Sequence, residues 1–187
     1  MNKETRRLVE SAILIAIGVV LSMFSFSGPW IKGGSITIAS MLPLVLISFR
    51  YGYRWGAFSA LVFAVIQAIL GVSNFSYAPN AGTWIAILLL DYLIPFTAIG
   101  FSSLFKNTTK NMALNVVIGI CITFSVRLVS HFISGWLIWQ ALWPEAGWIA
   151  WVYSLAYNAS YMIPEMLISS FLAFLSYQPL KKYWQGA

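Results

Sequence analysis

The chain has 187 residues, of which 60% are hydrophobic, 17% are aromatic and only 9% are charged. Soluble domains carry about 25% charged residues, so this composition excludes a water-soluble globule and, with it, a soluble enzyme or a nucleic-acid-binding domain. The formal net charge is +6, and the one cysteine, Cys121, excludes an internal disulfide and a multi-thiolate metal site. At this length we expect a single domain, residues 1–187.

Charged residues, prolines and glycines divide the apolar sequence into segments of about the length that crosses a bilayer, roughly 20 residues. Six segments result: 8–27, 35–49, 55–72, 83–105, 112–139 and 148–178. The second is short for a span, so we expect it to be tilted or partly irregular, and Pro164 is expected to kink the last. No small-residue cleavage site follows the first segment, so we do not interpret it as a signal peptide. The predicted fold is all-α: a polytopic membrane protein with six transmembrane helices.

The basic residues fall on one side of this six-span arrangement. That side holds Lys3, Arg6, Arg7, Arg50, Arg54, Lys106, Lys110, Lys181 and Lys182. The other side holds only Lys32, and Arg127 lies within the fifth segment. Because short cytoplasmic loops are enriched in Lys and Arg, we expect both termini in the cytoplasm, with loops 28–34, 73–82 and 140–147 outside. The basic charge therefore indicates topology and requires no nucleic acid.

Most of the tryptophans lie toward the predicted outer face. They are Trp30, Trp84, Trp136, Trp139, Trp143, Trp148 and Trp151. Only Trp55 and Trp184 lie toward the inner face. An interfacial aromatic belt is one explanation. The clustering around loop 140–147 favours a second, a pocket whose aromatic walls stack on flat heterocycles and attract cations.

Ionisable side chains within the hydrocarbon are costly, and each is a candidate for function. The apolar segments contain Asp91, Arg127, His131 and Glu165. Asp91 and His131 each lie eight residues from the outer end of their segment, hence about 12 Å deep. Tyr153 and Asn158 bracket the same depth on the last segment. These three helices predict a small-molecule site that opens outward.

The same residues also have purely structural interpretations. Arg127 and Glu165 lie deeper than the others and are predicted to form a structural ion pair. His131 is alternatively a satisfied core histidine, and Asp91 or Asn158 alternatively joins helices by hydrogen bonds. An enzyme that uses Asp91, His131 and Glu165 needs these groups within hydrogen-bond reach of one another. The different depth of Glu165 argues against it.

The candidate residues favour one kind of ligand, and the lack of an ATP-binding motif means that transport requires a partner. One carboxylate among Trp and Tyr rings suits a flat, cationic heterocycle, and disfavours an anion. The sequence contains no phosphate-binding loop, so it has no means of hydrolysing ATP itself. Ala12 and Ala16 have the spacing that lets another helix approach closely, either within the protein or from a partner.

Three segments resemble a known family. They are GGSITIASMLPLVLISFRYG (33–52), LLLDYLIPFTAIG (88–100) and the region from RLVSHFISG to YSLAYNASYMIP (127–164). In order and spacing they resemble the thiamine-specific substrate-binding (S) component of energy-coupling factor (ECF) transporters, which belong to the ABC type. The resemblance implies high-affinity thiamine (vitamin B1) uptake, no enzymatic activity, no cofactor and no metal. It also implies a partner module of one transmembrane scaffold protein and two ATPases, which alone use ATP.

The resemblance assigns thiamine binding to six positions: Asp91, Tyr92, His131, Trp139, Tyr153 and Asn158. Further candidates in the outer loops are Trp30, Gly34, Phe75 and Tyr77. Ala12 and Ala16 match the positions that contact the scaffold protein in this family. An S component for another vitamin or cationic heterocycle is the alternative, and competition with thiamine distinguishes the two.

Overall fold

The structure is a computed structural model that describes residues 2–27 and 35–185, and the described chain is mostly helical. The longer helices are α1 (Lys3–Met23), α2 (Leu42–Tyr51), α3 (Tyr53–Leu70), α6 (Met112–Ser134) and α8 (Ala150–Tyr177). The shorter ones are α4 (Ala81–Ile87), α5 (Ile94–Ile99), α7 (Gln140–Leu142) and α9 (Lys181–Trp184). Two strands, β1 (Ser25–Ser27) and β2 (Ser35–Thr37), pair antiparallel with Phe26 opposite Ile36.

Several of these helices are continued by tighter or wider helical turns. Two 3₁₀ turns, Val72–Tyr77 and Ser102–Phe105, follow α3 and α5. Two π-helical turns, Leu88–Leu93 and Gly135–Trp139, join α4 to α5 and α6 to α7 without breaking the helix. The chain therefore runs helically from Ala81 to Ile99 and again from Met112 to Leu142.

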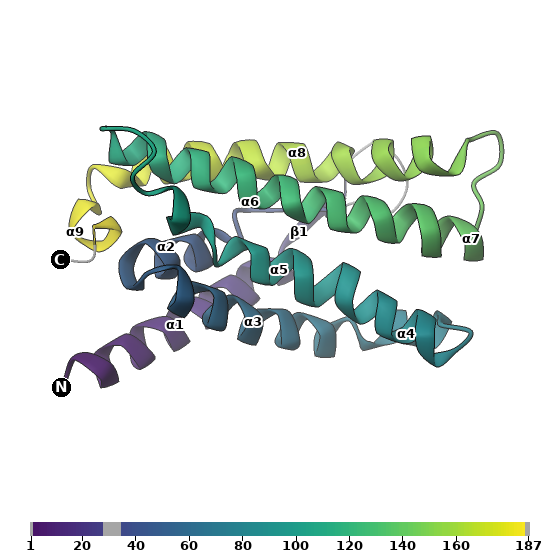
Figure 1. The fold of residues 1–187 in the computed structure, drawn as a ribbon, viewed down its shortest axis with the longest axis horizontal. Helices are drawn as coiled ribbons and strands as arrows, with labels where there is room; N and C mark the ends of the chain where they lie inside the picture. The colour runs from purple at the N-terminus through teal and green to yellow at the C-terminus, as the bar shows by residue number, and fades with distance from the viewer. Residues whose placement is uncertain (1, 28–34, 186–187) are drawn as a thin grey trace.

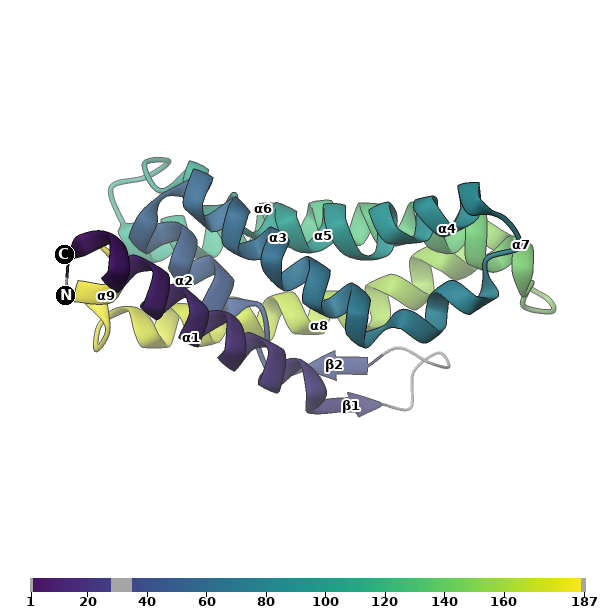
Figure 2. The ribbon, with the colours of Figure 1, turned by 90° about the horizontal axis from the view of Figure 1, so that it is seen from below.

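The helices run along the length of an elongated bundle (Figure 1). The start of α1 and the helix α9 lie at one end, whereas α4 and α7 lie at the opposite end in both views (Figures 1 and 2). Helix α6 packs along α8 on one flank, and α3 packs along α5 on the other.

Four helical stretches are long and apolar enough to cross a membrane: Tyr53–Leu70, Ala81–Ile99, Met112–Leu142 and Ala150–Tyr177. They correspond to the last four predicted segments. Pro164 lies inside α8, which continues on both sides of it. Helix α1 has 21 residues, but Arg6, Arg7 and Glu10 occupy its first half.

The predicted span 35–49 is partly irregular, as expected from its length, and only its second part is helical. Its first residues form β2, and helix begins only at Leu42, with Pro43 in the first turn where its missing N–H costs nothing. Ser35, Ile36 and Thr37 include two β-branched residues, which favour strand over helix. Helix α2 has ten residues and is about 15 Å long, half the thickness of the hydrocarbon core.

The bundle is tightly packed at the end that holds the start of α1. Leu44, Val45, Phe63 and Ile120 are fully shielded from solvent there. A Cβ added to Gly56 of α3 would lie 2.5 Å from the carbonyl oxygen of Gly100, so only glycine permits this approach of α3 to the end of α5. Both cavities discussed below lie away from this end, nearer α4 and α7 or midway along the bundle.

Candidate functional site

A cavity of about 600 Å³ lies between α3, the α4–α5 stretch, the α6–α7 stretch and α8. That volume is within the range of small-molecule sites, about 300–1,000 Å³. It is lined by Gln67, Asn74, Asp91, Tyr92, Phe96, His131, Gly135, Trp139, Gln140, Trp143, Glu145, Tyr153, Ser154, Tyr157, Asn158 and Tyr161. All six positions that the sequence assigns to the ligand are among them.

Asp91 lies in the π-helical turn between α4 and α5, and its side chain is 12% exposed. The Trp139 indole Nε1 donates a hydrogen bond to Asp91 Oδ2 at 2.9 Å. Ser130 of α6 donates to the carbonyl oxygen of Leu90 at 2.7 Å, which fixes this turn against α6. These bonds hold the carboxylate in one orientation. Its remaining acceptor positions face the cavity.

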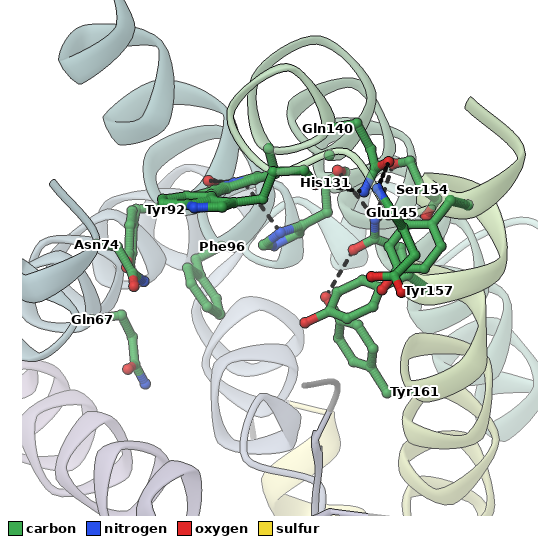
Figure 3. A pocket seen from close by; sticks show the side chains of 16 residues that line it. Gln67, Asn74, Tyr92, Phe96, His131, Gln140, Glu145, Ser154, Tyr157 and Tyr161 are labelled. Carbon is green, nitrogen blue, oxygen red and sulfur yellow. Dashed lines mark hydrogen bonds and ion pairs between the residues drawn. The ribbon is translucent and has the colours of Figure 1, made fainter. Parts of the chain in front are cut away.

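His131 lies next to this carboxylate. Its Nδ1 is 3.5 Å from Asp91 Oδ1, and its Nε2 is buried with no hydrogen-bond partner in the described chain. The imidazole points into the middle of the cavity, between Tyr92 on one side and Ser154 and Tyr157 on the other (Figure 3). A buried imidazole nitrogen is rarely left unsatisfied, which makes His131 a candidate ligand-binding residue.

Asn158 is largely used within the protein. Its amide nitrogen donates to the carbonyl oxygens of Ser154 and His131 at 2.9 and 3.3 Å, and its Oδ1 accepts from the Tyr161 hydroxyl at 2.9 Å. The bond to His131 joins α8 to α6, and the other two lie within α8. An amide oxygen has two lone pairs, so one acceptor position of Asn158 remains for a ligand.

Aromatic rings form two walls of the cavity. Trp139 and Trp143 stack with centroids 5.8 Å apart and planes inclined by 14°. On α8, Tyr153 and Tyr157 stack at 6.0 Å, and Tyr157 meets Tyr161 edge to face at 5.6 Å. Flat faces around a carboxylate suit a flat cation.

The other outer tryptophans that the structure describes do not line the cavity. Trp84, Trp136, Trp148 and Trp151 are each between 42% and 48% exposed on the outside of the bundle. The pocket interpretation therefore applies to Trp139 and Trp143, which line the cavity. The interfacial-belt interpretation suits these four.

Two of the outer-loop candidates lie elsewhere. Phe75 is buried in a cluster with Trp84 and Tyr92, at centroid distances of 4.8 and 5.4 Å, and does not line the cavity. Tyr77 is half exposed and packs edge-on against Trp143. Residues 73–82, which we predicted to form an outer loop, are mostly helical: they contain a 3₁₀ turn and the start of α4. Trp30 and Gly34 lie outside the described residues.

Tyr92 lines the cavity with its ring but directs its hydroxyl away from Asp91. The hydroxyl donates to the carbonyl oxygen of Gly71 at 3.2 Å and accepts from the Asn74 amide at 2.8 Å. A Cβ on Gly71 would lie 2.1 Å from this hydroxyl. Through this hydrogen bond Tyr92 links the end of α3 to the turn that carries Asp91.

Sequence reasoning missed several cavity residues, and some of them had a readable signal. Tyr157 and Tyr161 follow Tyr153 at four-residue steps, which places all three on one helix face. Trp143 follows Trp139 at the same spacing. Gln67 is a polar residue inside an apolar segment. Gln140, at the start of α7, and Glu145, in the loop that follows α7, gave no such signal, because the sequence does not reveal the path of the chain there.

Arg127 and Glu165 lie midway along the bundle and not in this cavity. Arg127 Nη1 and Glu165 Oε2 are 2.7 Å apart, and both side chains are buried. Ala12 and Ala16 are on the exposed face of α1, so they do not pack inside the bundle. No group of three or more His, Cys, Asp or Glu side chains suited to a metal occurs within residues 2–27 and 35–185.

A family model described as thiamine transporter protein, Thia_YuaJ, matches residues 8–184. The thiamine transporter ThiT of Bacillus subtilis (strain 168) is 35% identical over 179 residues, which cover 89% of this chain and 88% of that protein.

Two solved structures share the fold. A ThiT from Listeria monocytogenes has a TM-score of 0.75 at 24% identity, over 98% of this chain and 99% of the other. The S component of a bacterial ECF transporter has a TM-score of 0.65 at 19% identity, over 97% and 98%.

Proposed function

The chain belongs to the Thia_YuaJ family of thiamine transporter proteins, and from this premise we propose that it binds thiamine in the cavity beside Asp91. The family consists of transporters, so the function is capture and uptake of a vitamin and not an enzymatic reaction.

The observation that supports this site is the largely shielded carboxylate of Asp91 between aromatic walls. Thiamine consists of a thiazolium, which carries a permanent positive charge, and an aminopyrimidine, which carries hydrogen-bond donors and acceptors. We assign the thiazolium to the face of Trp139, with Asp91 as its counter-charge. His131 Nε2, the free lone pair of Asn158 and the Tyr153 hydroxyl are the hydrogen-bonding groups available to the rest of the ligand.

Calorimetric titration of the detergent-solubilised protein tests the ligand. We expect saturable binding of thiamine with one site per chain. Other vitamins and other cationic heterocycles, added in excess, should not displace it. Displacement by one of them at equal concentration would favour the alternative, an S component for that compound.

We further propose six membrane crossings, with both termini in the cytoplasm and the mouth of the cavity outside the cell. Helix α1 and the combined stretch of β2 and α2 would supply the two crossings beyond the four long apolar helices. The distribution of Lys and Arg supports this orientation. Because Cys121 is the only cysteine, a Cys121→Ser background with single cysteines at residues 108 and 146 permits a labelling test. An impermeant maleimide should label position 146 and not 108 in intact cells.

For transport we propose that the protein docks on an ECF module, in which a scaffold protein and two ATPases supply the energy. Ala12 and Ala16 lie on the exposed face of α1, and the larger Val20 follows at the same spacing. Small residues at this spacing allow a partner helix to approach closely. The multi-pass protein would then act in the cell membrane as the substrate-specific subunit.

A further inference from the structure

Helix α1, which carries the proposed docking surface, buries little of its own surface. Of its 21 residues, all of which the structure describes, only Ser11 and Gly18 are buried. Lipid chains are as apolar as the helix, so in a membrane an apolar face does not by itself hold a helix against its neighbours. The position of α1 therefore depends on a few specific contacts.

Two of these contacts are hydrogen bonds between neutral groups of α1 and α3. The Trp55 indole Nε1 donates to Ser11 Oγ at 2.9 Å, and the Gln67 amide donates to Ser22 Oγ at 2.8 Å. A hydrogen bond between neutral groups contributes little net stability, because both groups otherwise bond to water.

The strongest contact of α1 is an ion pair with the end of α2. Arg50 Nε lies 2.7 Å from Glu10 Oε2, and Arg50 Nη2 donates to Glu10 Oε1 at 3.4 Å. The Tyr51 hydroxyl donates to the same carboxylate. Two-point pairs between a guanidinium and a carboxylate are stronger than neutral hydrogen bonds, and they fix the orientation of both groups. This pair therefore sets the place of the first half of α1.

Arg50 also contacts the C-terminal helix α9. Its Nη1 donates to the carbonyl oxygen of Tyr183 at 3.5 Å, and its guanidinium carbon lies 4.9 Å from the centroid of the Tyr183 ring. Helix α9 is itself anchored, because Trp184 is buried and meets Phe49 of α2 edge to face. The start of α1 and α9 lie at the same end of the bundle (Figure 2). One guanidinium thus joins α1 to two elements of the tightly packed end.

A second arginine bonds to the same carboxylate without joining two helices. Arg6 Nε lies 2.7 Å from Glu10 Oε1, but Arg6 belongs to α1 itself and its side chain is 52% exposed. The Arg50 side chain, by contrast, is only 5% exposed, so a partner protein does not reach it directly. When Arg50 is removed, Arg6 remains as a cation beside Glu10.

This network is separate from the ligand site. Neither Glu10 nor Arg50 lines the large cavity. A second, smaller cavity of about 220 Å³ lies midway along the bundle beside the pair of Arg127 and Glu165, and it too is lined by other residues. A change at Arg50 should therefore leave the ligand-binding residues in place.

We propose that Arg50 is a positioning residue for docking: through Glu10 it holds α1 where Ala12 and Ala16 meet the partner helix. These alanines follow Glu10 by two and six residues, which is about 3 and 9 Å along the helix axis. A closely packed helix pair tolerates little displacement of either helix. The inference rests on the proposed function, because docking on the ECF module is the step that requires α1 in this position.

The first test compares two variants that each remove one arginine from Glu10. For Arg50→Gln we expect thiamine uptake by cells that contain the module to fall at least about tenfold, since breaking a buried ion pair costs more than a factor of ten in an equilibrium. Calorimetric titration of the purified variant should show thiamine affinity within about twofold of the wild type, because the sites are distant. Arg6→Gln, the matched control, should transport normally. Arg50→Lys keeps the charge opposite Glu10 and should restore most of the uptake.

The second test measures the position of α1 without ligand or partner. In a Cys121→Ser background, Ile13→Cys on α1 and Val126→Cys on α6 place spin labels at two exposed positions. The distance distribution between the labels should be narrow in the otherwise unchanged chain and in Arg6→Gln. In Arg50→Gln it should shift or broaden.

Normal uptake by Arg50→Gln overturns the inference, and so does an equal loss of uptake in Arg6→Gln. Lost uptake with an unchanged distance distribution also overturns it, because Arg50 then acts by some means other than the position of α1. Where Arg50→Gln does not fold, Tyr51→Phe weakens the same contact without removing a charge, and a smaller loss of uptake is expected. Failure of the wild type to bind thiamine overturns the proposed function, whereas the distance measurement still decides whether Arg50 positions α1.

Discussion

Trp139 and Asp91 are joined by a 2.9 Å hydrogen bond from the indole Nε1 to the carboxylate Oδ2, and each residue lies in a π-helical turn of a different helix. A π turn inserts one extra residue into a helix and shifts the direction of the side chains that follow it, and such turns are frequent at functional sites. The two turns together bring an anionic group and a large aromatic face to one point of the cavity. This pair defines where a flat cation would lie.

Replacement of Asp91 by Asn tests the counter-charge. The amide keeps the shape of the side chain but removes the negative charge opposite the thiazolium, so we expect thiamine affinity to fall by more than tenfold. Asp91→Glu, which keeps the charge, is the matched variant and should lose less. An unchanged dissociation constant for Asp91→Asn in a calorimetric titration would remove Asp91 from the site.

Gly135 permits close contact between the α6–α7 stretch and α8. A Cβ at this position would lie 2.3 Å from Ser154 Oγ and 3.1 Å from Asn158 Nδ2. We expect Gly135→Ala to destabilise the protein by about 1–3 kcal/mol through overpacking, and to weaken thiamine binding because Asn158 must move. Thermal unfolding with and without thiamine measures both effects. Gly82→Ala is the control, since its Cβ would meet only Asn80 Oδ1, at 3.3 Å.

Glu145 is an exposed residue that lines the cavity, and its negative charge favours the approach of a cation. For Glu145→Gln we expect the association rate constant of thiamine to fall by about two- to fivefold at low ionic strength. The difference should vanish at high salt, where charges more than a few ångströms apart are screened. Stopped-flow fluorescence measures the rate, and Glu4→Gln at the opposite end should leave it unchanged. A salt-independent difference would mean that Glu145 acts by contact.

Glu165 and Arg127 are a buried pair, and removal of one partner leaves an uncompensated charge. Glu165→Gln should therefore lower stability by about 3–5 kcal/mol. The double variant Arg127→Met/Glu165→Met removes both charges and should be more stable than the single variant. Thermal unfolding followed by tryptophan fluorescence compares the two. A single variant as stable as the wild type would show that the pair is not needed for the fold.

Ala16 on α1 tests the partner surface separately from ligand binding. A tryptophan at this exposed position should block a closely packed partner helix, so uptake of thiamine by cells that contain the module should be lost. Binding of thiamine to the purified variant should not change, because Ala16 does not line the cavity. Val126→Trp, at a 45% exposed position of α6, is the control and should transport normally. Normal uptake by Ala16→Trp would place the docking surface elsewhere.

The sequence was informative about the helices and about the depth of polar residues. Interruptions of the apolar runs located the four long apolar helices to within a few residues, because a charged residue inside the hydrocarbon is costly. The same cost singled out Asp91 and His131, and a helix rise of 1.5 Å per residue placed Tyr153 and Asn158 at their level. All four line one cavity.

The remaining features depend on tertiary contacts that no local pattern encodes. The strands Ser25–Ser27 and Ser35–Thr37 pair with each other, although hydropathy alone assigns the first to the end of one span and the second to the start of the next. Phe75 is an outer aromatic residue like Trp143, yet the first packs under Tyr92 and the second faces the cavity. The π turns that hold Asp91 and Trp139 are also invisible in the sequence, because one extra residue in a helical turn hardly changes its periodicity.

Titration of the solubilised protein with thiamine, followed by intrinsic tryptophan fluorescence, tests the central claim most directly. We predict saturable quenching at sub-micromolar thiamine that is largely lost in Trp139→Ala, because the thiazolium stacks on that indole. The variant Trp148→Ala, at an exposed position outside the cavity, should retain the quenching. If millimolar thiamine neither changes the fluorescence nor binds in the calorimetric titration, thiamine is not the ligand of this site.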